Sequence, residues 1–192
     1  MKISKDQPKR KILRLKDFDY TTEGAYFVTI CTRNMEDYFG KVIYEEMILN
    51  KSGQMIEEWW KKLEKKYEEI ILDEYIIMPN HLHGVLMIIR DKPVGTDPRV
   101  RPDNKDKPVG ADLRVRPNPS LSDFIKWFKT MTTNHYIRNV KVENWKPFDK
   151  KLWQRSFYER IIRNEKDLNN IREYIINNPL KWEWEKGHVH NI

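Results

Sequence analysis

The stretch that most constrains the fold runs from residue 81 to 90 and reads His-Leu-His-Gly-Val-Leu-Met-Ile-Ile-Arg. Beyond Gly84 apolar residues follow one another without alternation, so both faces of an extended segment would be apolar. This pattern is typical of a strand in the middle of a sheet that is covered on both sides. The rest of the chain must therefore supply neighbouring strands and covering helices.

The composition agrees with one folded domain. A length of 192 residues favours a single domain, and 7 Trp, 9 Tyr and 7 Phe are enough to build a core. The single cysteine, Cys31, excludes an internal disulfide framework and a cysteine-cluster zinc site. No run approaches the roughly 18 apolar residues of a membrane helix, and the N-terminus lacks the apolar core of a secretory signal. We expect a soluble, intracellular protein.

Positive charge is concentrated in two segments. The chain has a net charge of +7, and residues 1–19 and 150–172 each carry seven basic and three acidic residues. The first segment is interpreted as a basic N-terminal arm that could lie along phosphates, with a solvated, solubilising tail as the alternative. Its candidate contacts are Lys9, Arg10, Lys11 and Arg14.

Hydrophobic patterning predicts alternating strands and helices. Strands are expected over 25–33, 69–78, 81–90 and 153–163, with a short strand or hairpin over 39–49. Helices are expected over 52–67, 120–138 and 165–178, with Ser120 as a cap and Pro179 as a stop. The order predicts an α+β protein with a ferredoxin-like antiparallel sheet and packed helices.

An internal repeat interrupts this order. Residues 91–102 recur at 106–117 with ten of twelve positions identical. Proline, glycine and charged residues dominate both copies, so the segment cannot bury enough apolar surface to offset its ordering entropy. The sequence therefore predicts a flexible insertion at 91–118 within a single domain spanning 20–192.

Two histidines open the predicted central strand. His81 and His83 are two positions apart, so their side chains project from the same strand face and could share one divalent ion. A hydrogen-bonded structural pair is the alternative. The pair at 188 and 190 has the same spacing but is interpreted as tail. His135 is interpreted as a charge placed near a helix C-terminus.

The last predicted helix adds a phenol and an amide. Tyr174 and Asn178 are four residues apart and share one helix face. A tyrosine hydroxyl can act as a nucleophile, and an asparagine oxygen is a neutral metal ligand. Amphipathic packing of the tyrosine and a helix stop at the asparagine are the alternatives.

Several motifs occur together in a specific order. They are Phe-Asp-Tyr at 18–20, Gly-Ala-Tyr-Phe-Val-Thr-Ile-Cys-Thr at 24–32, Met-Pro-Asn-His-Leu-His-Gly at 78–84, Trp-Gln-Arg-Ser-Phe-Tyr at 153–158, Ile-Arg-Asn at 162–164 and Tyr-Ile-Ile-Asn-Asn-Pro at 174–179. With these motifs the chain resembles the IS200-like tyrosine transposases of the HUH superfamily, most closely the REP-associated tyrosine transposases. The resemblance spans nearly the whole chain apart from 91–118 and the two ends.

The resemblance implies a reaction and its residues. Tyr174 would be the catalytic nucleophile, while His81, His83 and Asn178 would bind Mg²⁺ or Mn²⁺. The implied activity is single-stranded DNA cleavage and strand transfer at hairpin DNA through a 5′-phosphotyrosine link. A cytoplasmic, nucleoid-associated monomer or homodimer without a membrane partner is expected. The alternative is a domesticated relative that binds nucleic acid without cutting it. Further phosphate contacts are expected from Arg155, Arg160 and Arg163.

Overall fold

The computed structural model describes residues 22–90 and 118–182. Three expectations lie outside the described residues. They are the DNA contacts of the basic arm (Lys9, Arg10, Lys11 and Arg14), the insertion at 91–117, and the assignment of His188 and His190 to a tail.

A four-stranded antiparallel sheet organises the chain, in the order β4-β5-β1-β6. Its strands are β1 (Gly24–Cys31), β4 (Ile70–Ile77), β5 (His81–Ile88) and β6 (Tyr158–Ile162). β5 is a central strand, as its two apolar faces predicted. Together with the helices after β1 and β5, this order is the ferredoxin-like arrangement expected from the sequence.

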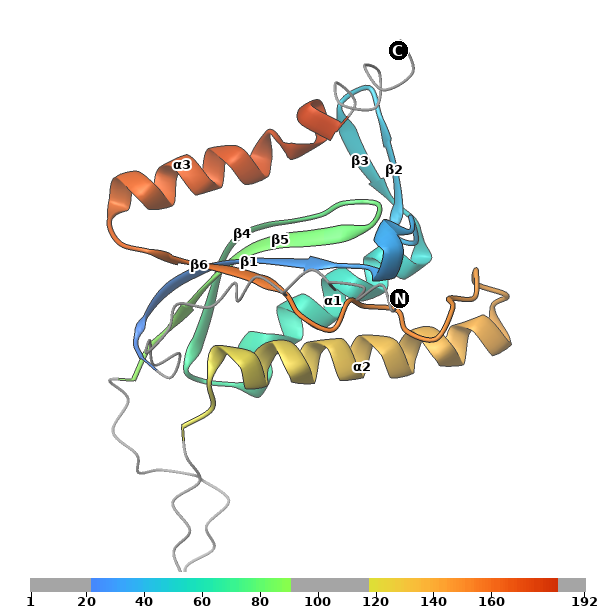
Figure 1. Ribbon diagram of the computed structural model, residues 1–192, viewed down its shortest axis with the longest axis horizontal. Helices are drawn as coiled ribbons and strands as arrows, with labels where there is room; N and C mark the ends of the chain where they lie inside the picture. The colour runs from blue at the N-terminus through green and yellow to red at the C-terminus, as the bar shows by residue number, and fades with distance from the viewer. Residues whose placement is uncertain (1–21, 91–117, 183–192) are drawn as a thin grey trace, which may run out of the picture.

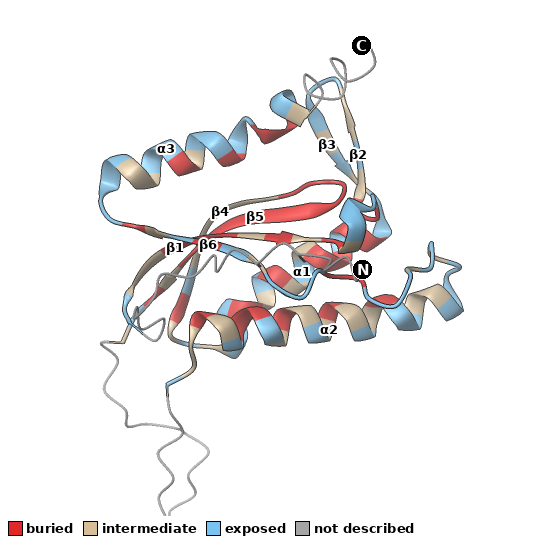
Figure 2. Ribbon diagram, viewed as in Figure 1, coloured by how far each residue is buried: buried red, intermediate tan, exposed pale blue. Residues whose placement is uncertain are grey.

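Helices cover both faces of the sheet (Figure 1). α1 (Lys51–Lys66) and α2 (Leu121–Val142) pack on one face, and α3 (Glu165–Ile176) lies over the other. Figure 2 shows buried residues on both sides of the sheet. The larger core lies under α1 and α2 and includes Trp60 and Phe128, whereas a small core under α3 includes Phe27 and Ile175.

Strand alternation assigns the residues of β1 to these two cores. Tyr26, Val28 and Ile30 belong to the α1/α2 core, and Phe27 between them belongs to the α3 core. This alternation brings Phe27, and two positions later Thr29, to the face that α3 covers.

The segment over 39–49 forms a hairpin, which was one of the two expectations for it. β2 (Gly40–Ile43) pairs with β3 (Glu46–Leu49) in a separate two-stranded sheet. A short 3₁₀ helix, η1 (Arg33–Met35), connects β1 to this hairpin region.

Two predicted boundaries were wrong. The strand expected over 153–163 begins only at Tyr158, because Trp153 makes a single bridge with Thr32 and then turns its buried ring into the α1/α2 core. There the indole Nε1 donates to Thr132 Oγ1 at 2.9 Å. The helix expected to end at 138 continues to Val142. The other predicted elements agree with the structure to within two residues at each end.

The interpretation of His135 was also wrong. This residue lies seven positions before the end of α2, so it does not occupy the last turn. Its Nδ1 accepts a hydrogen bond from Trp59 Nε1 at 2.9 Å, and burial lowers its pKa. Both features favour a neutral ring that packs α1 against α2 rather than a charge interacting with the helix dipole.

Candidate active site

The first and third residues of β5 present a pair of imidazoles. His81 and His83 lie on the α3 face of the sheet, and their Nε2 atoms are 3.1 Å apart. Antiparallel pairing sets them opposite Cys31 and Thr29 of β1. Both rings are nearly inaccessible to solvent, with exposed fractions of 7% and 6%.

The other ring nitrogens are held by neighbouring side chains. His81 Nδ1 lies 2.8 Å from Asn80 Oδ1, and the Asn80 amide nitrogen in turn donates to Met35 O at 2.9 Å. Because an amide oxygen only accepts, His81 donates through Nδ1 and keeps a lone pair on Nε2. The Thr29 hydroxyl, which can donate or accept, lies 2.8 Å from His83 Nδ1, so His83 Nε2 carries a lone pair in the tautomer that holds its proton on Nδ1. These contacts direct both Nε2 atoms to one point.

Burial keeps both rings neutral. It lowers the pKa of His81 to about 4 and that of His83 to about 3, since the charged form would lose its hydration. The proximity of His81 lowers the His83 pKa further. A hydrogen bond between the Asn178 side chain and the His81 ring opposes the effect of burial on His81. Neutral imidazoles are the form that binds a metal ion.

The phenol of Tyr174 reaches this pair from α3. Its hydroxyl lies 3.4 Å from His83 Nε2, and its ring packs against His83 and Phe27 with centroid distances of 5.3 and 6.0 Å. Lys181 Nζ lies 4.7 Å from the centre of the same ring. Tyr174 is 37% exposed, whereas both histidines are buried.

Asn178 completes the group. α3 ends at Ile176, and after a turn at Asn177 the backbone is helical again over 178–182. Asn178 is 7% exposed, and its side chain lies beside the His81 ring, where it raises the pKa of that ring. The structure thus brings His81, His83, Tyr174 and Asn178 into one cluster.

The donors fit one divalent ion. Two ligands at right angles on an ion, each about 2.1 Å from it, lie about 3.0 Å apart, close to the Nε2 separation seen here. Residues 22–90 and 118–182 contain no group of three His, Cys, Asp or Glu side chains suited to an ion. Asn178, an amide side chain beside the His81 ring, is a candidate third ligand.

The three predicted arginines do not form one cluster. Arg155 lines a cavity beside α2, on the other face of the sheet from Tyr174. Arg160 pairs with Asp167 of α3 at 2.5 Å, which ties β6 to the helix. Arg163 is exposed just after β6. Their contact with DNA stays a prediction.

Two residues of the site were missed in the sequence. Thr29 and Asn80 hold the histidine rings, yet neither has an ionisable side chain. The signal for Thr29 was available, because antiparallel pairing of the two apolar strands places some β1 residue opposite His83. Which residue that is depends on the register, which the sequence left open.

The fold and the cluster together define a class of α+β proteins. A ferredoxin-like sheet carries paired imidazoles on a central strand, and a helix on the same face presents a tyrosine to them. Within the described part of the chain no helix is both long enough and apolar enough to span a bilayer.

Comparison with known proteins identifies the family within this class. The family described as "Transposase IS200 like" matches residues 112–178, a range that includes Tyr174 and Asn178. An uncharacterized protein of Haemophilus influenzae is 34% identical over 180 residues, covering 94% of this chain and 93% of its own. The chain belongs to the IS200-like transposase family.

A solved structure shares the fold. A REP-associated tyrosine transposase bound to a REP hairpin superposes with a TM-score of 0.54 at 18% identity. The match covers 89% of this chain and 76% of the other.

Proposed function

We propose that this transposase is a metal-dependent single-stranded DNA endonuclease and strand transferase. Tyr174 is the nucleophile, and His81, His83 and Asn178 hold the ion. One observation carries the proposal: the Tyr174 hydroxyl lies 3.4 Å from an imidazole nitrogen that is itself 3.1 Å from its partner's. A tyrosine that served only in packing would not need its hydroxyl beside two buried imidazole nitrogens while its side chain stays 37% exposed.

The neutral, preoriented rings support metal binding. Both Nε2 atoms converge because Asn80 and Thr29 occupy the opposite nitrogens. A divalent ion bound there supplies Lewis-acid polarisation of a non-bridging phosphate oxygen. Imidazole ligands favour Mn²⁺ intrinsically, while Mg²⁺ is more available.

Tyr174 carries the covalent chemistry. Its phenolic oxygen forms a bond to phosphorus as the bond from phosphorus to the 3′ oxygen breaks, and the 3′ oxygen leaves as a hydroxyl. The product is a 5′-phosphotyrosine link that retains the phosphodiester for rejoining to another 3′-hydroxyl. The phenol must lose its proton during the attack, and the departing 3′ oxygen must gain one.

The substrate class follows from the family and from the solved relative. That relative is bound to a REP hairpin, which supports hairpin DNA as the substrate here. An exposed phenol at the sheet surface suits a flexible single strand next to such a hairpin, since the scissile phosphate must come within bonding distance of one oxygen.

A labelling experiment tests both the nucleophile and the polarity. Hairpins with single-stranded flanks, taken from palindromes beside the gene, are labelled at either end and incubated with the protein and Mn²⁺. On a denaturing gel the 3′-labelled piece should migrate with the protein, and the 5′-labelled piece should be released. Tyr174→Phe should bind the same DNA and form no adduct. Hairpin binding by the unmodified protein without any adduct would instead favour the non-cleaving alternative.

A further inference from the structure

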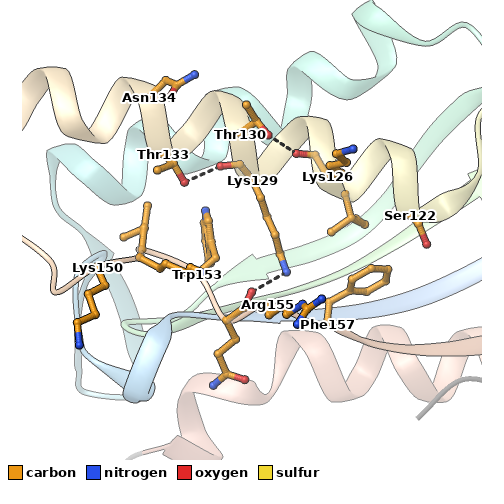
Figure 3. Close-up of a pocket in the computed structure, with 14 residues that line it drawn as sticks. Ser122, Lys126, Lys129, Thr130, Thr133, Asn134, Lys150, Trp153, Arg155 and Phe157 are labelled. Carbon is orange, nitrogen blue, oxygen red and sulfur yellow. Dashed lines mark hydrogen bonds between the residues drawn. The ribbon is translucent and has the colours of Figure 1, made fainter. Parts of the chain in front are cut away.

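A second feature lies on the opposite face of the sheet from Tyr174. A cavity of about 520 Å³ opens between α2 and the segment 150–157 that leads into β6 (Figure 3). Its lining contains no aspartate or glutamate. The basic residues that line it are Lys126, Lys129, Lys150, Lys151 and Arg155. We call this cavity the basic groove. Five cations without an acidic partner in the lining attract a polyanion.

The ammonium group of Lys129 is held in place in the lining of the basic groove. Its Nζ donates to the backbone oxygens of Gln154 and Ser156 at 3.1 and 3.0 Å, and Figure 3 draws the bond to Gln154. An ammonium group has three N–H donors, so one remains for a ligand. Burial lowers the pKa of Lys129 to about 8, which leaves it mostly protonated at neutral pH. A bound phosphate would replace the hydration that burial removed.

The groove connects to Tyr174 around one edge of the sheet. Phe157 lines the groove, and the next residue, Tyr158, begins β6 and lies on the other face. Tyr158 is 43% exposed, and its ring centre is 6.5 Å from that of Phe27, which in turn contacts Tyr174. β6 is an edge strand, so a ligand can pass around it.

The path from the basic groove around the β6 edge to Tyr174 requires a flexible ligand. Duplex DNA has a persistence length of about 150 base pairs and cannot bend around a single strand of sheet. Single-stranded DNA can bend around the β6 edge, and an exposed tyrosine offers a surface on which a base stacks. Resting on the proposed function, we propose that the basic groove binds backbone phosphates of single-stranded DNA, which crosses the β6 edge past Tyr158 to reach Tyr174.

Salt dependence of binding tests the groove. The full chain is titrated in EDTA, without cleavage, against a fluorescent oligothymidine of roughly 20 nucleotides, longer than most single-strand sites. The variant Lys126→Gln/Arg155→Gln removes two exposed groove charges. Each lost phosphate contact should reduce the slope of log affinity against log salt by about 0.7, and the pair should weaken binding about tenfold at physiological salt. Lys65→Gln/Lys66→Gln on α1 is the matched control with the same loss of charge.

Stacking on Tyr158 is tested separately. Tyr158→Ala should weaken binding of the same oligonucleotide about fivefold or more. Tyr44→Ala, which removes a 91%-exposed tyrosine at the tip of the β2–β3 hairpin, should change nothing. Circular dichroism checks that every variant is folded.

The outcomes separate this proposal from the proposed function. The groove proposal is overturned if the slope of log affinity against log salt is unchanged in the groove variant, or if it falls equally in the α1 control. The groove proposal is also overturned if the groove variant loses more affinity for duplex DNA, RNA or an acidic polypeptide than for the oligothymidine. A reduced slope together with no covalent adduct from the unmodified protein retains the groove and contradicts cleavage instead.

Discussion

Arg172 of α3 donates two hydrogen bonds to the carboxylate of Asp73 on β4, at 2.7 and 2.5 Å. Arg172 lies two residues before Tyr174, and β4 is the neighbour of the strand that carries the histidines. The pair therefore fixes the position of the tyrosine helix over the sheet. The Arg172 hydrogen bonds also hold the pKa of Asp73 below its ordinary value.

Loss of this pair should reduce the rate of DNA cleavage. In Asp73→Asn the helix keeps its apolar contacts, but the phenol is less firmly placed, and a misplacement of about 1 Å can slow a reaction up to about 100-fold. Adduct formation measured over time should slow, while oligonucleotide affinity in EDTA stays unchanged. An adduct rate equal to that of the unmodified protein would show that the ion pair does not position Tyr174.

The same pair predicts a pH dependence of stability. Because the folded-state pKa of Asp73 is lowered, its contribution is present above the unfolded value of about 3.9 and is lost as pH falls through the folded value. Urea unfolding at neutral pH should show Asp73→Asn to be less stable than the unmodified chain. The difference should shrink in acid below that unfolded value. A difference that grew in acid would contradict the assignment.

The residues that hold the histidine rings should control metal affinity. Thr29→Val removes the partner of His83 Nδ1 without a large change in volume, and loss of such a partner typically lowers metal affinity about 10–100-fold. Mn²⁺ binding followed by electron paramagnetic resonance measures this. Thr29→Ser keeps the hydroxyl and should retain most of the affinity. Equal affinity in Thr29→Val would mean that His83 needs no such support.

The sequence predicted the strands and helices that have strong hydrophobic patterns. The central place of β5 followed from its two apolar faces, and the helix over 52–67 from its apolar stripe, whose Trp60 is fully buried. The Ser120 cap also forms, with Asp123 completing the reciprocal pair of hydrogen bonds. In each case the determining interactions are local.

The remaining features depend on contacts that no local pattern encodes. The Asp73–Arg172 pair joins residues 99 positions apart, and the basic groove forms only because the segment 150–157 packs along α2. Trp153 and its neighbours looked like the start of a strand, but burial of the indole in the core competes with strand pairing there. The cluster around Tyr174 was expected from the family resemblance, and the roles of its residues stay predictions.

A side chain added at Gly84 should disturb the packing of β5 against α1. A Cβ at this position, which follows His83 in β5, would lie 2.5 Å from Cζ2 of the Trp60 ring. Gly84→Ala should therefore lose about 1–3 kcal/mol of unfolding free energy. Combined with Trp60→Phe, the loss should be smaller than the sum of the single losses, because the smaller ring leaves room for the methyl group. Strict additivity in urea unfolding would contradict this contact.

Removal of the metal should abolish cleavage and leave the fold intact. EDTA should stop adduct formation, and added Mn²⁺ should restore it in the unmodified protein. His81→Ala should form no adduct at any Mn²⁺ concentration, since one of the two imidazoles is gone, yet should unfold cooperatively on heating. Undiminished adduct formation by His81→Ala would remove this residue from the proposed metal site.

Mass spectrometry of the covalent adduct identifies the nucleophile. Trypsin cleaves after Arg172 and Lys181, and the peptide between them contains Tyr174 as its sole tyrosine. After nuclease trimming, a 5′-phosphonucleotide should remain on this peptide, attached to the Tyr174 oxygen. Attachment to another residue, such as Tyr158 in the tryptic peptide 156–160, would contradict this assignment.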